Sequence, residues 1–134
     1  MEGNLNHLAI IVAALSTFLL GGLWYSPILF GKAWQQENKL TDEDLKQGNM
    51  AKIFGLTFVF SLIMAYNLGF FLNDPAIDAT MGLLYGFLTG FGWTAMGIFI
   101  HGQFERKSTR YMLINGGYMI VALTVMGLII GAWK

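Results

Sequence analysis

Long uncharged stretches, separated by short polar ones, dominate the sequence. Four of them contain no Asp, Glu, Lys or Arg: residues 3–31, 53–73, 79–104 and 111–133. A helix of about 20 apolar residues crosses the hydrocarbon core of a bilayer, so each stretch can hold one span. The pattern predicts an all-α fold, an integral membrane four-helix bundle that forms a single transmembrane domain over residues 1–134. The expected spans are about 5–26, 51–72, 79–101 and 111–132.

The third stretch contains a stripe of glycines. Gly82, Gly86 and Gly90 recur at every fourth position, and residues four apart lie on one face of a helix. Small residues at this spacing let two transmembrane helices approach closely. We therefore predict that this helix is the central packing element. Other glycines expected to pack helices are Gly21, Gly69, Gly127 and Gly131.

The connection over residues 28–50 is the longest one. Phe30 and Trp34 are four residues apart, which favours an amphipathic turn lying in the membrane interface. Thr41 followed by Asp44 is typical of a helix N-terminus and predicts a short polar helix at 41–49. An ordinary solvated loop is the alternative.

The basic residues indicate an orientation. Seven of the eight lie in or beside the first and third connections. Cytoplasmic connections are enriched in Lys and Arg, so the connection at 28–50 is expected in the cytoplasm and both termini outside. These seven residues are Lys32, Lys39, Lys46, Lys52, Arg106, Lys107 and Arg110.

The two halves of the chain share residues at fixed offsets. The same residue types as Gly21, Trp24 and Phe30 recur 69 positions later, at Gly90, Trp93 and Phe99. In the second helix of each half the offset is 62, and it relates five pairs of residues. Chance matching in a biased composition is the alternative to duplication. The pattern predicts two parallel two-helix repeats that bring helices one and three together through their small faces. The pairs at offset 62 are Met50 and Met112, Gly55 and Gly117, Val59 and Val121, Met64 and Met126, and Gly69 and Gly131.

Composition supports a membrane protein. The chain is 55% hydrophobic and 12% charged, whereas soluble domains are about a quarter charged. A net charge of zero gives no basic field for nucleic acid, and the absence of cysteine excludes disulfides and thiolate metal sites. The expected partners are the lipid bilayer of the cell inner membrane and, because glycine stripes often pack subunits, further copies of the chain in a homo-oligomer, with a dimer favoured.

Few polar groups lie within the spans. None of the four contains a central charged residue, which argues against proton pumps and voltage sensors. His7 and His101 are expected at opposite membrane interfaces, too far apart to share a metal, and we expect no metal or cofactor. Water or headgroup contacts are the ordinary role for His101, and a proton-responsive gate is the alternative.

Asn67 and Asn115 lie inside spans two and four, where a buried amide needs partners. Hydrogen bonding between helices is one role, and contact with a ligand is the other. Trp24 and Tyr25 suit interface anchoring, whereas Trp93 and Tyr118 are expected to lie deeper. The candidate residues of a pocket or path are Trp93, His101, Asn115, Tyr118, Asn67, Tyr25 and Ser26.

Enzyme signatures are absent from the sequence. It contains no P-loop, GxSxG or HExxH motif. Ser26 with His101 is the best available nucleophile and base pair, and no acid accompanies it.

Three segments resemble one family: residues 6–34, which contain GGLWYSP and FGKAW, residues 50–68, and residues 115–133, which begin NGGY. The sequence resembles the bacterial membrane-protein family catalogued as domain of unknown function 1761. The resemblance covers nearly the whole chain and implies a four-span membrane protein. It assigns no activity, and no role to Tyr25, Ser26 or Pro27 in its most specific motif.

Three functional hypotheses follow. The first is a small transporter or channel for an uncharged or weakly polar solute, with a path along Asn67, Trp93, His101, Asn115 and Tyr118. The second is a non-transport protein that binds lipid or a membrane partner through its glycine and aromatic faces. The third, a membrane enzyme, has the least support.

Overall fold

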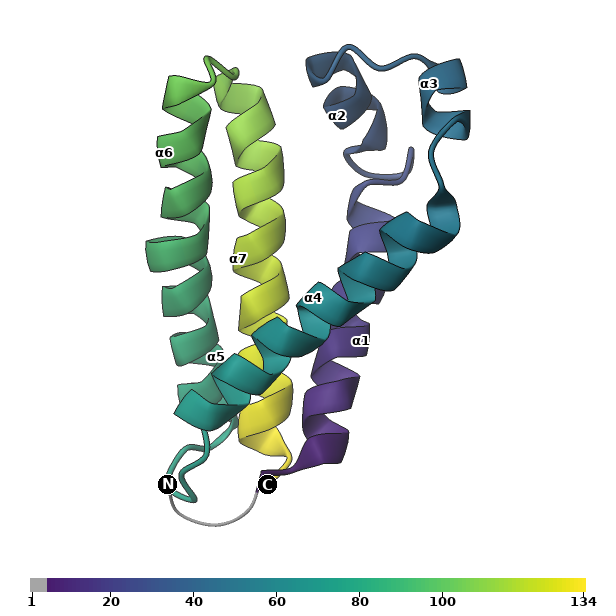
Figure 1. The fold of residues 1–134 in the computed structure, drawn as a ribbon. Helices are drawn as coiled ribbons and strands as arrows, with labels where there is room; N and C mark the ends of the chain where they lie inside the picture. Colours follow the sequence, from purple (N-terminus) through teal and green to yellow (C-terminus); the bar gives the residue numbers. More distant parts are fainter. Residues whose placement is uncertain (1–4) are drawn as a thin grey trace.

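The computed structural model describes residues 5–134, and these residues form helices and no strands (Figure 1). Four helices are long and apolar enough to cross a membrane: α1 (His7–Trp24), α4 (Met50–Phe71), the continuous helix Ala79–Phe104 and α7 (Thr109–Ala132). The predicted all-α fold with four spanning helices is confirmed. The protein is therefore a multi-pass membrane protein.

The third spanning helix has three parts. These are α5 (Ala79–Thr89), a π-helical segment η1 (Gly90–Ala95) and α6 (Met96–Phe104). In η1 the Thr94 hydroxyl donates a hydrogen bond to the Thr89 carbonyl at 3.2 Å, which satisfies an acceptor where the helix widens. The glycine spacing did not predict this segment.

Two short helices occupy the first connection: α2 (Gly31–Glu37) and α3 (Asp42–Lys46). The Asp44 N–H donates to the Thr41 hydroxyl at 3.1 Å, and the Thr41 N–H donates to the Asp44 carboxylate at 2.9 Å. The predicted N-terminus at Thr41 is thus confirmed, and the hydrogen bonds from Thr41 lower the pKa of Asp44. The helix ends earlier than expected, because Asn49 instead caps α4.

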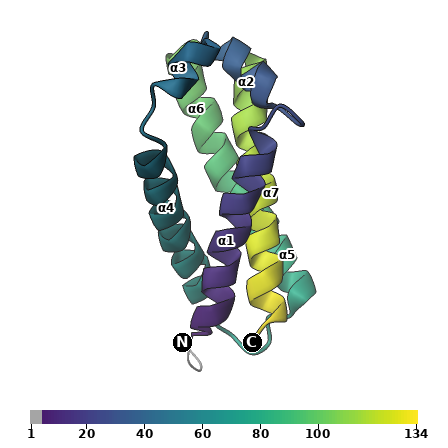
Figure 2. The same cartoon turned by 90° about the vertical axis from the view of Figure 1, so that its right-hand side faces the viewer.

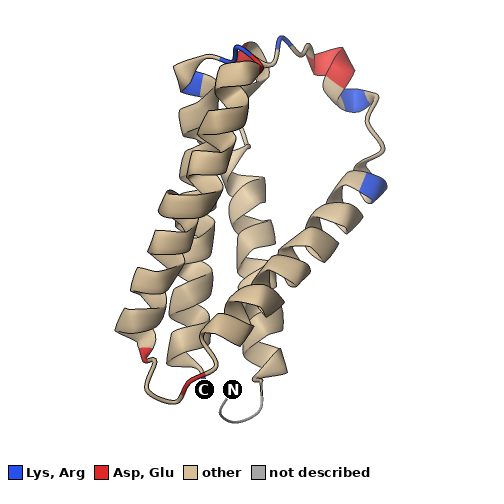
Figure 3. Ribbon diagram, turned by 60° about the vertical axis from the view of Figure 1, so that its left-hand side comes forward, with Lys and Arg blue, Asp and Glu red and all other residues tan. Residues whose placement is uncertain are grey.

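The two ends of the bundle differ in charge (Figure 3). One end, called here the basic end, holds α2, α3 and the α6–α7 turn. The other, the terminal end, holds the α4–α5 turn and the described chain ends (Figure 1). The seven basic residues of the first and third connections lie in the segments of the basic end or beside them: Lys32, Lys39, Lys46, Lys52, Arg106, Lys107 and Arg110.

Helix α7 is the centre of the bundle. It packs against α1, α2, α4, α5, η1 and α6 (Figure 2). Of an 18-residue apolar stretch of α7, 44% is buried within the protein, whereas the corresponding share in the other three spans is 17–28%. The core is built from α1, α4 and α7 around Ile10, Ala65, Leu123 and Met126. The third span was predicted to be central, but the fourth is.

The glycine stripe of α5 and η1 packs on α7, its own hairpin partner. A Cβ at Gly82 would lie 3.0 Å from Cα of Gly131, and one at Gly86 would lie 2.9 Å from the Leu123 carbonyl carbon. Gly90 fits equally closely against Ile120. The expected meeting of helices one and three is wrong: α1 packs on α4 and α7 instead. The short turn between α6 and α7 makes the third and fourth spans antiparallel neighbours. The glycine stripe of the third span therefore packs on α7, the helix nearest to it.

The other predicted packing glycines lie at different contacts. Gly21 faces the Tyr118 hydroxyl and Gly69 faces the Ile10 side chain, whereas Gly127 and Gly131 meet the backbone of α5 and its N-cap Asp78. The stripe is therefore filled within one chain and cannot also serve a second subunit. The expected homodimer stays a prediction, and its interface would need another face.

Candidate functional site

Residues 24–34 close the end of α1 in a compact turn, called here the clasp. The Phe30 N–H donates to the Trp24 carbonyl at 2.9 Å, and the Gly31 N–H donates to the Ser26 carbonyl at 2.8 Å. Gly31 is buried where a Cβ would lie 2.6 Å from the carbonyl carbon of Ser26, so a larger residue does not fit. The Trp24 and Phe30 rings lie 4.7 Å apart and cover this turn.

The clasp docks on α7 through two side chains. The Trp24 indole Nε1 donates to the Ile114 carbonyl at 2.9 Å, and the Tyr25 hydroxyl donates to the Asn115 amide oxygen at 2.6 Å. Both bonds join residues about 90 positions apart. Interhelical hydrogen bonds of this kind contribute about 0.6 kcal/mol on average in membranes, so the pair fixes geometry more than stability.

The segment from Asn115 to Tyr118 on α7 is shaped to receive aromatic rings. A Cβ at Gly117 would lie 3.2 Å from the Trp24 ring, and one at Gly116 would lie 3.0 Å from the Phe99 ring. Tyr118 donates to the Thr17 carbonyl at 2.9 Å, and its ring centre lies 5.4 Å from that of Tyr25. Two segments far apart in the sequence thus form one cluster.

This cluster forms one wall of a hollow of about 490 Å³ near the basic end. The Asn115 amide oxygen is held by Tyr25, and no hydrogen bond from the Asn115 amide nitrogen is formed among the described residues. That nitrogen is a donor for a guest with an acceptor oxygen. Glu105 is the sole charged residue in the lining, which consists of Tyr25, Thr94, Gly97, Ile98, His101, Gly102, Glu105, Tyr111, Asn115, Tyr118 and Met119.

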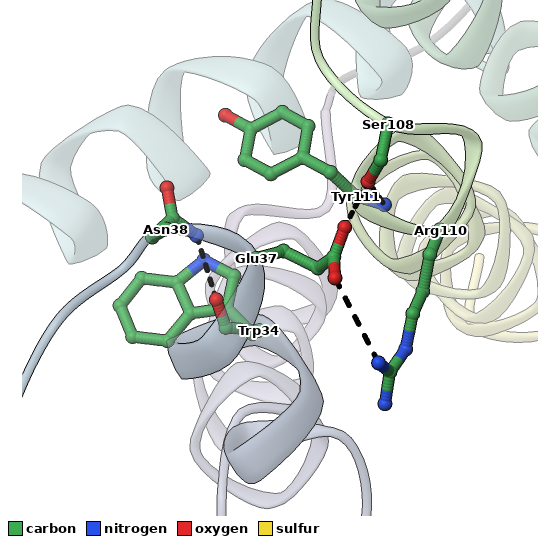
Figure 4. Close-up of polar contacts among 6 residues, drawn as sticks. All are labelled: Trp34, Glu37, Asn38, Ser108, Arg110 and Tyr111. Carbon is green, nitrogen blue, oxygen red and sulfur yellow. Dashed lines mark hydrogen bonds and ion pairs between the residues drawn. The ribbon is translucent and has the colours of Figure 1, made fainter.

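Helix α2 fastens the clasp to the start of α7 (Figure 4). The Ser108 hydroxyl donates to the Glu37 carboxylate, and the Arg110 guanidinium lies 3.7 Å from the other Glu37 oxygen. Trp34 packs edge-on against Tyr25, with ring centres 5.7 Å apart. An exposed ion pair contributes at most about 1 kcal/mol, so Glu37 positions α2 rather than stabilising the bundle.

A second hollow, of about 400 Å³, lies on the side of the bundle between α4 and η1 and is called here the lateral hollow. Apolar side chains form most of its lining. Thr94 of η1 lines both hollows, so the two hollows adjoin at this residue. The lining consists of Phe60, Ile63, Met64, Asn67, Leu68, Phe71, Thr89, Trp93, Thr94 and Leu123.

The seven candidate residues thus divide into three groups. Tyr25, His101, Asn115 and Tyr118 share the basic-end hollow. Trp93, 81% exposed, and Asn67 share the lateral hollow, where the Asn67 amide donates to its own helix at Ile63. Ser26 lines neither hollow and donates to the Leu23 carbonyl instead.

Sequence reasoning missed Gly31, Gly102 and Glu105, which shape or line the site. The FGKAW motif contains Gly31 and was the available signal for it. For Glu105 the signal was its position four residues after His101, on the same helix face. Over residues 5–134 no group of three or more His, Cys, Asp or Glu side chains is placed to hold a metal ion.

Comparison with known proteins yields one match. Over residues 8–131 the sequence matches the family described as "Protein of unknown function (DUF1761)". No curated protein and no solved structure matches significantly. The matched range includes the clasp, both hollows and all four spanning helices except their outermost residues. The chain therefore belongs to the DUF1761 family of proteins of unknown function.

Proposed function

We propose that this protein is a small transporter or channel of the cell inner membrane for an uncharged, weakly polar solute, which binds in the basic-end hollow. In this proposal the basic end faces the cytoplasm and both termini face outward, as the distribution of Lys and Arg favours. The observation that carries it is the hollow beside Asn115, with its hydrogen-bond donor and aromatic wall.

The chemistry of the hollow supports an uncharged guest. Its volume of about 490 Å³ falls within the usual range for small-molecule sites, about 300–1,000 Å³. Tyr25, Tyr118 and Tyr111 offer ring surface, while Asn115 and His101 offer hydrogen bonds. No basic side chain lines it to balance an anion, and a single carboxylate, Glu105, is a poor site for a cation.

The two hollows adjoin at Thr94, which supports passage of a solute from one hollow to the other and not binding alone. A solute with an apolar part can enter the lateral hollow from the bilayer, and the basic-end hollow begins on the other side of Thr94. The π-helical turn that contains Thr94 is a less regular element, of the kind found at functional sites.

The second candidate is a non-transport role in which the protein holds a lipid. The apolar lining of the lateral hollow favours it, because an acyl chain matches Phe60, Ile63 and Trp93. The glycine stripe of α5 and η1 does not favour binding of a helix from another protein, since α7 already packs against it.

The test is solute entry into liposomes containing the purified protein, followed by light scattering with erythritol, a small uncharged polyol, as the probe. We expect the wild-type protein to accelerate swelling over empty liposomes. Asn115→Leu should reduce the rate about tenfold, which corresponds to loss of one hydrogen bond worth about 1.4 kcal/mol.

Asn38→Leu is the matched control, because the Asn38 amide donates to the Trp34 carbonyl of α2 and Asn38 lines neither hollow. Its rate should stay within about twofold of wild type. Equal rates for wild-type protein, Asn115→Leu and empty liposomes would contradict transport of this solute class. A lipid that stays bound through purification, with no flux, would favour the second candidate.

A further inference from the structure

Helix α4 is buried against the bundle at its terminal end and largely exposed toward the basic end, where Phe54 and Phe58 still contact Phe18 of α1. Near the terminal end, Leu68 is 5% exposed, Gly69 contacts Ile10, and Tyr66 contacts His7 through a 2.8 Å hydrogen bond. Toward the basic end, Phe60 is 62% exposed and Leu56 is 43% exposed. Figure 3 shows this part of α4 diverging from the other spanning helices. The lateral hollow lies between η1 and the part of α4 that diverges from the other helices.

The equivalent face of α7 is docked along its whole length. At the offset of 62 residues, Leu56, Phe60 and Leu68 correspond to Tyr118, Ala122 and Ile130. All three of these α7 residues are buried. Two helices that the predicted repeat relates therefore differ in packing at one end.

The partner helices show the same difference. Trp24 and Trp93 correspond at the offset of 69 residues. Trp24 donates to the Ile114 carbonyl and lies against Gly117 on α7. Trp93 is 81% exposed at the edge of the lateral hollow. Trp24 is therefore packed on the opposite hairpin, whereas its counterpart Trp93 is not.

The hairpins themselves pair in the same register, which supports the correspondence. The glycine stripe on α5 and η1 corresponds to Ala13, Thr17 and Gly21 on α1, where Ala13 and Thr17 are likewise buried small residues. Gly69 on α4 lies against Ile10, and its counterpart Gly131 lies against Asp78, the residue before the equivalent of Ile10. The hairpins differ in closeness, however, because Gly21 lies against Tyr118 of α7, whereas its counterpart Gly90 lies against Ile120 of its own hairpin partner.

We propose that α4 has a second position, in which its basic-end half closes over the lateral hollow and packs on η1 and α6. Leu56 then approaches Thr94, as its counterpart Tyr118 contacts Tyr25, and Trp93 becomes covered. The contacts of Gly69 and Tyr66 hold the terminal end of α4 in place during this movement.

Physical reasons favour two positions of similar free energy. Lipid tails are as apolar as Phe60 and Trp93, so exposing these side chains in a bilayer costs little. Closure would gain packing contacts with η1 and α6, and it would lose lipid contacts together with the contacts of Phe54 and Phe58 with Phe18 on α1. These gains and losses nearly offset each other. The residues that join α3 to α4, 47–49, form no helix and leave the basic end of α4 able to move. The closure concerns packing alone and stands apart from the proposed function.

Disulfide formation between introduced cysteines tests the closure directly, since the natural chain has none. The reporter pair is Leu56→Cys with Thr94→Cys, in liposomes under mild oxidation, scored by loss of reactivity to a large maleimide. A disulfide needs the two Cα atoms within about 7 Å. We expect this pair to cross-link several-fold faster than Gly55→Cys with Thr94→Cys. Leu56 lies one turn before Phe60, on the face of α4 that lines the lateral hollow, whereas Gly55 lies about 100° round the helix.

A third pair, Ile10→Cys with Gly69→Cys, reports correct folding, because a Cβ at Gly69 would lie 3.0 Å from Cγ1 of Ile10, at the end of α4 that stays in place. It should cross-link whether or not α4 moves. If it cross-links fully while Leu56→Cys with Thr94→Cys stays reduced, α4 does not close. Equal rates for the Leu56 and Gly55 pairs would also overturn the proposal, since they would reflect random collision. The assay needs no solute, so failure of transport leaves its result unaffected.

Discussion

Gly22 and Gly31 belong to the same sequence motif but have opposite surroundings. At Gly31 an added Cβ would lie against the carbonyl groups of Tyr25 and Ser26, whereas at Gly22 no atom lies within 4 Å. The backbone cannot yield at Gly31 without breaking the hydrogen bond from Gly31 to Ser26. At the residue scale, therefore, one glycine holds the clasp together and the other is free to vary.

Gly31→Ala should destabilise the protein by about 1–3 kcal/mol through overpacking. Gly22→Ala should be neutral, or stabilise α1 by up to about 1 kcal/mol through helix propensity. Thermal unfolding of both variants in the same detergent measures the difference. Indistinguishable midpoints would show that the clasp does not need a glycine at position 31.

The depth of a residue along a span was easier to predict than the direction in which it points. Tyr25 was expected at the membrane interface and Tyr118 deeper in its span, and both line the basic-end hollow together with Asn115. Trp93 was grouped with Tyr118 but lies on the outer face, 81% exposed. In water a polar face marks the outside of a helix, but in lipid both faces are apolar, so the pattern does not distinguish them.

At the scale of helices, the glycine stripe determines how closely α5 and η1 approach α7. The sequence predicted that Gly82, Gly86 and Gly90 would be packed, and they are. It did not identify the partner, because small residues permit close approach to any helix. The short α6–α7 turn, from Glu105 to Ser108, was the signal that favoured the hairpin neighbour.

Gly86→Ala should force α5 away from α7, because the new Cβ would lie 2.9 Å from the Leu123 carbonyl carbon and 3.1 Å from Cα of Thr124. Backbone atoms cannot rotate aside, so we expect a loss of about 1–3 kcal/mol, measured as a lower unfolding midpoint in detergent. Gly55→Ala on α4, with no atom within 4 Å, is the matched control. An unchanged midpoint for Gly86→Ala would mean that the two helices are not held at this contact.

At the scale of the whole molecule, the distribution of basic residues and the course of the chain both distinguish the two ends of the bundle. The ends of the described chain, residues 5 and 134, and the α4–α5 turn lie at one end of the bundle, and seven basic residues lie in or beside the connections at the other (Figures 1 and 3). The number of spanning helices could be predicted from the sequence, because the length of each apolar stretch can be compared with the roughly 20 helical residues that a bilayer requires. The position of α4 could not, since it depends on packing differences too small for a hydrophobic pattern to encode.

The central claim is that four helices span the membrane with the basic end in the cytoplasm, and labelling of single cysteines in intact cells tests it most directly. Lys46→Cys reports the basic end and Ala76→Cys the α4–α5 turn, both at exposed positions. We predict that a membrane-impermeant maleimide labels Ala76→Cys on intact cells and Lys46→Cys only after permeabilisation. Labelling of both on intact cells would contradict a spanning bundle, and the reverse pattern would contradict its orientation.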